Sequence, residues 1–231
     1  MKFLLSFTIL FSVFLSSDMT SAKDFSGSVD VSIRQRFFEE GRLGRVNGFS
    51  EWGALEFGVN FGVYEFDMGL EPFVGFSFIQ NSAVLYAEDA SGNLILQDGD
   101  PVPTNDRLKY QVYTSRMGTR YKPWKFDFFP VIPFGEAALA YRFCRVNKAT
   151  FAVGQKKSSN GGDLGFDIGG GVLFSFFTNK VRRAEMYAEW GLSDFGLLIS
   201  SRYMFSGYTH GLGSLKGLGG YDFGGSIFID W

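Results

Sequence analysis

The sequence is short of the residues on which disulfide frameworks, metal centres and most catalytic dyads depend. Its 231 residues include a single cysteine, Cys144, and a single histidine, His210. One cysteine cannot form an intramolecular disulfide, although small exported domains often rely on disulfides. The charges are nearly balanced, with 22 basic and 24 acidic residues and a net charge of −2. Nucleic-acid binding requires a basic surface, so we expect no nucleic-acid partner.

Long hydrophobic runs are missing after residue 17. No later stretch approaches the roughly 18 consecutive apolar residues of a membrane-spanning helix. The first stretch, MKFLLSFTILFSVFLSS, has one basic residue, Lys2, before an apolar run that ends at Ser17, and Thr20-Ser21-Ala22 follows it. This pattern predicts a secretory signal peptide over residues 1–22 and an exported domain over residues 23–231.

Aromatic residues and glycine are abundant, with 28 Phe, 10 Tyr and 30 Gly. A soluble core needs fewer aromatic residues, so the surplus indicates an apolar medium outside the protein. Apolar and polar residues alternate in eight segments: 25–34, 52–61, 67–78, 108–121, 131–143, 164–175, 195–205 and 221–231. In all of these except 108–121, the charged residues fall on one side of the alternation. This pattern predicts the strands of a transmembrane β-barrel with a polar lumen, whereas a soluble barrel would be apolar inside.

The alternation breaks in segment 108–121. The residues predicted to point outward from its first half are Leu108, Tyr110, Val112 and Thr114. Unbroken alternation would then expose Arg116 and Arg120 to lipid, at a cost of roughly 2–4 kcal/mol each. We therefore predict a one-residue bulge around Thr114–Arg116 that turns both arginines inward.

The connections between segments alternate in length, which predicts the topology. The long polar connections are Gln35–Ser50, Gln80–Arg107, Cys144–Asp163 and Ser206–Gly220, and the short ones are Gly62–Phe66 and Lys122–Phe129. Bacterial barrels have short periplasmic turns and long external loops, so the first strand should rise from the periplasm, and Gln80–Arg107 should be exposed outside.

Residues 180–191, which include AEMYAEWG, fit either a ninth strand or a short helix. An even strand number is typical of bacterial barrels and favours the helix. The predicted fold is all-β: an eight-stranded antiparallel transmembrane β-barrel with a short periplasmic helix before strand seven.

Several short motifs resemble those of a known family. They are RYKPW at Arg120–Trp124, IPFGEAALAY at Ile132–Tyr141, GFDIGGGV at Gly165–Val172 and the aromatic end YDFGGSIFIDW. Over roughly Phe25–Trp231 the chain resembles the small bacterial outer-membrane barrels of the OmpA transmembrane-domain and opacity-protein type.

The resemblance implies a location in the bacterial outer membrane and a place in the cell envelope. It also implies two partners, the outer-membrane lipids and the barrel assembly machinery. In that family the last strand is an assembly signal, which here would comprise Tyr221, Phe223, Ile227, Ile229 and Trp231. The family usually ends in Phe, so Trp231 is a departure that keeps the aromatic ring.

The inward charges predict an ion-pair network that fills the lumen. Its members are Arg34, Glu56, Glu71, Arg116, Arg120, Glu136, Arg142, Asp167 and Arg202. We expect Arg116 to meet Glu71 or Glu136 on the neighbouring strands; the alternative is that these charges are merely hydrated. Eight strands enclose a space that side chains can fill, so no large pore is expected.

These features favour a non-enzymatic barrel that contributes envelope structure or contacts a surface partner through its loops. The alternative is a lipid-modifying enzyme or small-ligand carrier on the same scaffold. Lipid A deacylases resemble one another in a His-x-Ser motif, whereas here Ser214 stands four residues after His210. No partner spacing supports a catalytic dyad, so we predict no catalytic residues, cofactor or metal.

Overall fold

The computed structural model describes most of the chain beyond the first 26 residues. The described residues are 27–38, 54–63, 69–87, 89, 95–98, 100–123, 130–149, 157–176, 180–211 and 218–231. The predicted signal peptide at 1–22 lies outside them, as do parts of the predicted connections.

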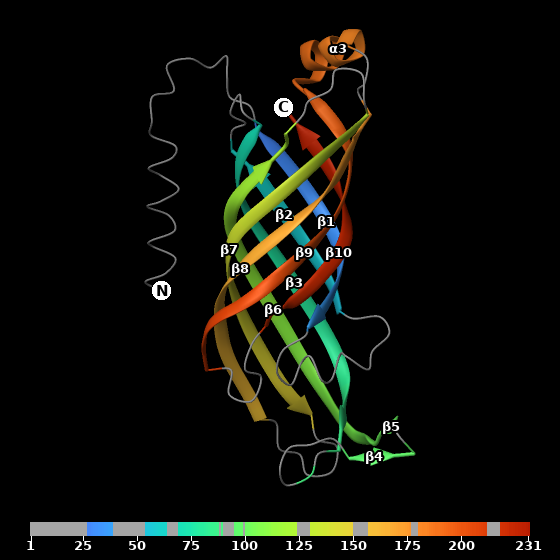
Figure 1. Cartoon of the computed structure of the whole chain (residues 1–231), viewed down its shortest axis with the longest axis vertical. Coiled ribbons are helices and arrows are strands. Elements are labelled where there is room, and N and C mark those ends of the chain that lie inside the picture. Colours follow the sequence, from blue (N-terminus) through green and yellow to red (C-terminus); the bar gives the residue numbers. More distant parts are fainter. Residues whose placement is uncertain are drawn as a thin grey trace.

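Eight antiparallel strands close into a barrel (Figure 1) in the order β1-β10-β9-β8-β7-β6-β3-β2. Their bounds are β1 Ser28–Phe38, β2 Ala54–Gly62, β3 Leu70–Tyr86, β6 Pro103–Tyr121, β7 Val131–Ala149, β8 Lys157–Ser175, β9 Asp194–His210 and β10 Gly220–Asp230. Two short strands, β4 Leu96–Gln97 and β5 Asp100–Pro101, form a separate hairpin at one end of the barrel. The predicted closed eight-stranded antiparallel architecture is confirmed.

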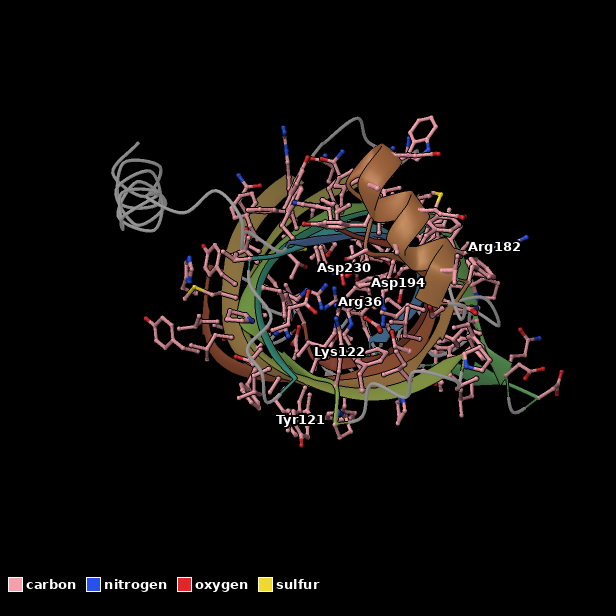
Figure 2. All side chains as sticks on the ribbon, turned by 90° about the horizontal axis from the view of Figure 1, so that it is seen from above. Arg36, Tyr121, Lys122, Arg182, Asp194 and Asp230 are labelled. Atoms are coloured by element: carbon pink, nitrogen blue, oxygen red, sulfur yellow. The ribbon has the colours of Figure 1, made fainter. Side chains whose placement is uncertain are left out.

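Side chains alternate between the lumen and the outer surface because successive residues of a strand point to opposite faces. Lys122 points into the ring and its neighbour Tyr121 points away from it (Figure 2). Along β1, Asp30, Ser32 and Arg34 are buried, while Val31 and Ile33 are exposed. The barrel is therefore polar and charged inside along much of its length, and apolar outside.

The predicted bulge in β6 is absent, and the prediction was wrong. Pairing between β3 and β6 runs without interruption from Leu70↔Tyr121 to Val84↔Arg107. The four residues that were expected outside, Leu108, Tyr110, Val112 and Thr114, are buried on the same face as Arg116 and Arg120. Leu108, Tyr110 and Val112 face inward because this end of the lumen is packed with apolar residues. Both arginines thus reach the lumen by simple alternation.

Several strands extend further than predicted at one or other end, so the connections between them are shorter than predicted. β1 extends to Phe38, β3 to Tyr86 and β7 to Ala149, while β6 starts at Pro103 and β8 at Lys157. Backbone pairing continues there although the outward residues become polar. The strands of 17 and 19 residues are longer than the roughly 9–11 residues that a transmembrane β-strand needs.

A short helix, α3 (Lys180–Trp190), lies between β8 and β9 at the barrel end opposite the β4–β5 hairpin (Figure 1). It is followed by Gly191 with φ 67°, a left-handed conformation that favours glycine after a helix. Val181, Tyr187 and Trp190 are exposed, so the helix packs little against the barrel. No helix in the described part of the chain is long and apolar enough to cross a membrane.

Candidate functional site

The interior of the barrel has three layers. An apolar cap lies toward the β4–β5 end and comprises Phe38, Ala54, Ile79, Leu108, Tyr110, Val112, Cys144, Val146 and Leu218. An apolar base lies toward α3 and comprises Ile132, Phe134, Leu173, Leu198 and Phe228. Charged side chains occupy the lumen between these layers. Figure 2 shows side chains filling the ring, with Arg36 among them.

The central cluster is a chain of three arginines bridged by two carboxylates. Glu56 accepts hydrogen bonds from Arg36 Nη1 at 3.0 Å and from Arg202 Nη2 at 3.1 Å. Asp222 accepts from Arg202 Nε at 3.1 Å and from Arg34 Nε at 3.0 Å. All five side chains are almost fully buried. Each carboxylate thus joins two guanidinium groups from different strands.

Two further contacts tie this cluster to the barrel wall and to the cap. Arg34 Nη1 donates to Ser200 Oγ on β9 at 2.9 Å. Arg36 Nη2 donates to the backbone oxygen of Leu218, which precedes β10, at 3.2 Å. Leu218 belongs to the apolar cap, so this hydrogen bond joins the charge cluster to the cap.

A second cluster lies closer to α3. Arg120 Nη2 donates to Asp30 Oδ2 at 2.8 Å, and Asp30 Oδ1 accepts from Asn60 Nδ2 at 2.7 Å. Asn60 Oδ1 in turn accepts from Arg116 Nη2 at 2.7 Å. Glu136 stands further off, 3.7 Å from Arg116 and 3.6 Å from Arg120. The neutral amide of Asn60 therefore links Arg116 to the aspartate that Arg120 contacts directly.

Glu71 forms an ion pair at the α3 end of the charged layer, with Lys122 Nζ at 2.6 Å. It also accepts a hydrogen bond from Ser28 Oγ. Lys122 Nζ also lies 4.9 Å from the centre of the Phe228 ring, at the apolar base. Cations over aromatic faces are stabilised by the ring quadrupole. The Lys122 ammonium at the border of the apolar base is therefore stabilised by both Glu71 and the Phe228 ring.

A third cluster centres on Arg142. Its guanidinium pairs with Asp163 at 3.0 Å and with Asp167. Asp163 also accepts a hydrogen bond from Ser206 Oγ at 2.9 Å, where β8 and β9 shift register. The bulge residue Gly207 donates its backbone N–H to the same carboxylate at 3.3 Å. Asp163 therefore accepts a hydrogen bond from the backbone N–H at the bulge as well as pairing with Arg142.

The structure places all nine predicted charges inside the barrel and adds others. Arg36, Lys122 and Asp163 were predicted to lie in connections, and Asp222 was not among the predicted members of the network. Continuing the alternation past the predicted strand ends would have found the first three. The ion-paired lumen groups in the described part of the chain are Arg34, Arg36, Arg116, Arg120, Lys122, Arg142 and Arg202 with Asp30, Glu56, Glu71, Glu136, Asp163, Asp167 and Asp222. Seven cations thus meet seven carboxylates.

The five residues of the expected assembly signal all lie on the outward side of β10 and its end. Tyr221, Phe223 and Ile227 are exposed, and Trp231 pairs with Gly27 through two backbone hydrogen bonds of 3.0 and 2.9 Å. The Trp231 ring lies directly over Gly27, where a side chain would collide with it. Trp231 therefore helps to join β1 and β10 at the barrel's closing seam.

His210 and Cys144 occupy different places in the wall. His210 lies at the outer surface, with ring centres 6.2 Å from Tyr141 and 6.3 Å from Tyr208. Ser214 falls outside the described residues. Cys144 is fully buried in the apolar cap. In the described part of the chain no three His, Cys, Asp or Glu residues are grouped so that they could hold a metal ion.

No model of a protein family matches this sequence, and no curated protein matches it. Among solved structures, it is similar to Ail, the attachment invasion locus protein of Yersinia pestis, with 11% identity, a TM-score of 0.48, and coverage of 90% of this chain and 99% of that one. For Neisserial surface protein A the identity is 14%, the TM-score 0.48 and the coverage 89% and 95%. For a major outer membrane protein from Thermus thermophilus the identity is 13% and the TM-score 0.44, with coverage of 89% of this chain and 99% of that one.

Proposed function

We propose that the chain is a non-enzymatic barrel of the bacterial outer membrane, with a filled lumen and no large pore. It contributes to the structure of the envelope and presents its long hairpins outside. The observation that supports this most directly is the outer surface of the barrel. Every barrel strand exposes large apolar residues there: Val31, Ile33, Leu55, Phe57, Phe61, Phe76, Tyr113, Met117, Tyr121, Leu139, Leu164, Phe166, Ile168, Phe174, Leu197, Ile199, Tyr203, Phe205, Tyr221, Phe223 and Ile227.

This surface suits lipid and would be costly in water. Soluble proteins rarely expose continuous apolar patches larger than a few hundred Å². A soluble barrel of this size would also keep its charges outside and its apolar residues inside. Here fourteen ion-paired groups lie within the wall and an apolar band surrounds it. The distribution is that of a membrane barrel.

Fractionation of cells that express the full chain tests the location. We expect the protein in the outer-membrane fraction, released only by detergent, with a folded band that migrates differently before and after boiling. A periplasmic maltose-binding protein and an inner-membrane helical protein serve as fraction controls. Recovery from the periplasm without detergent would refute the proposed location.

The non-enzymatic part of the proposal is supported by the surroundings of His210, whose ring neighbours are Tyr141 and Tyr208. A nucleophilic hydroxyl needs a base within about 3 Å and a third group that orients the base. The alternative, a lipid-modifying enzyme, is tested by comparing lipid A from cells with and without the gene. We expect identical acyl chains and phosphates, and a change that His210→Ala abolishes would favour the enzyme.

A further inference from the structure

The outer face of β3, β6 and β7 changes character abruptly along the strands. Phe78, Tyr113 and Phe143 stand side by side in one row, since Phe78 pairs with Tyr113 and Tyr113 with Phe143. Their ring centres are 5.0 and 6.5 Å apart. Aromatic residues form girdles at both edges of the apolar band of an outer-membrane barrel. This row therefore marks the band's edge on the β4–β5 side.

The next two rows toward the β4–β5 end are entirely polar. Gln80 pairs with Gln111, which pairs with Arg145, and Ser82 pairs with Lys109, which pairs with Asn147. We call these six residues the polar ledge: Gln80, Ser82, Lys109, Gln111, Arg145 and Asn147. Gln111 Nε2 donates to Gln80 Oε1 at 3.2 Å. Five of the six line a half-open pocket of about 410 Å³, and Arg145 adjoins it in register beside Gln111.

The ledge has a positive charge with nothing acidic beside it on the same face. Lys109 and Arg145 are exposed, on adjacent strands and one row apart. The outward positions of β3, β6 and β7, counted by register, hold no Asp or Glu anywhere along the three strands. In the lumen, by contrast, every lysine or arginine of the three clusters has a carboxylate partner. Among the side chains that the structure describes, no carboxylate pairs with Lys109 or Arg145, and the amides and hydroxyls around these two cations suit a ligand with both anionic and sugar-like groups.

We propose that the polar ledge binds the phosphorylated sugar headgroup of an outer-leaflet lipid. The height of the ledge supports a lipid over a soluble partner. Strands rise about 3.3 Å per residue and tilt by roughly 45°, so the two polar rows lie about 5 and 10 Å above the aromatic row. The headgroup layer starts at the edge of the apolar band and is roughly 5–8 Å thick on each side of the bilayer, so the first polar row lies within it and the second lies at its outer border. The acyl chains would then lie on the apolar rows below Tyr113. This proposal rests on the membrane location proposed above.

The test uses the full chain folded in neutral detergent micelles. The probe is a synthetic diphosphorylated, acylated glucosamine disaccharide, compared with the same lipid without phosphates and with inorganic phosphate. Each basic residue near a charged lipid surface contributes about fivefold in affinity. We expect K109Q/R145Q to bind the diphosphorylated lipid about 25-fold more weakly than the wild type, and the dephosphorylated lipid to bind poorly to both. Inorganic phosphate alone should not saturate the site.

The matched control is Arg182→Gln, which removes an exposed arginine (labelled in Figure 2) from α3, at the other end of the barrel (Figure 1). It should bind the lipid as the wild type does. Equal binding by K109Q/R145Q, no preference for the phosphorylated lipid, or saturation by inorganic phosphate would each overturn the headgroup site. If a ledge variant fails to fold, the lipid comparison on the wild type still decides. If the membrane location itself is wrong, the fractionation experiment shows it independently of the lipid-binding measurement.

Discussion

Arg202 is the residue on which the central ion pairs of the lumen converge, since it bonds both Glu56 and Asp222. Replacing it by methionine leaves two buried carboxylates that each lose one of two arginine partners. Loss of one partner of a buried ion pair costs about 3–5 kcal/mol. We expect the unfolding free energy of Arg202→Met to fall by this amount in urea titrations of the detergent-folded barrel. Arg182→Met on exposed α3 is the control and should change it by less than about 0.5 kcal/mol.

Glu136 should matter less, although it also lies near two arginines. Its distances to Arg116 and Arg120 are 3.7 and 3.6 Å, and those arginines keep Asn60 and Asp30 as closer partners. The substitution Glu136→Gln retains the shape and a hydrogen-bonding group. We expect a smaller loss of stability than for Arg202→Met in the same titration. An equal or larger loss would show that Glu136, rather than the bridging carboxylates, holds the network together.

Alternation determines the side of the wall that a residue faces, but not its partner. Arg116 was expected to meet Glu71 or Glu136, and it lies 3.7 Å from Glu136, whereas Glu71 pairs with Lys122, a residue assigned to a turn. Partner choice depends on side-chain length, strand tilt and register, none of which a single sequence specifies. Leu108 and Val112 show a related limit, because an apolar residue suits both the lipid and an apolar cap. Only a charge on the same face, such as Arg116, distinguishes the two.

At the scale of strands, the alternation of apolar and polar residues predicts the number and approximate position of the eight barrel segments but not their lengths. Beyond the apolar band the outer face becomes polar, as at Gln80 and Arg145, so the hydrophobic signal stops while the hydrogen-bonded ladder continues. The helix at Lys180–Trp190 was favoured by the even strand count, and a helix is present there. Its periplasmic location stays a prediction.

The orientation of the barrel can be tested with single introduced cysteines. Gln97→Cys lies in the exposed β4–β5 hairpin, and Glu189→Cys lies on exposed α3 at the opposite end. We expect a membrane-impermeant maleimide to label Gln97→Cys on intact cells, and Glu189→Cys only after the outer membrane is permeabilised. The native Cys144 is fully buried and should give no background. The reverse labelling pattern would invert the topology.

At the scale of the whole molecule, the layered interior predicts a closed barrel. An apolar cap and an apolar base enclose a lumen in which seven cations pair with seven carboxylates. We expect no steady conductance in planar bilayers, with a sixteen-stranded porin in the same bilayer as the open control. A large, stable conductance from the wild-type chain would contradict the filled lumen.

The unequal strand lengths divide the wall into two parts that should respond differently to force. The short strands β10, β1 and β2, with 11, 11 and 9 residues, are neighbours in the ring. The other five, β9, β8, β7, β6 and β3, have 17 or 19 residues and form one continuous sheet. When the chain is pulled from a membrane by its N-terminal end, the short strands β1 and β2 leave first, so the barrel should yield in small early steps at low force before the long strands are extracted. When it is pulled by its C-terminal end, only β10 is short, and the barrel should resist from β9 onward.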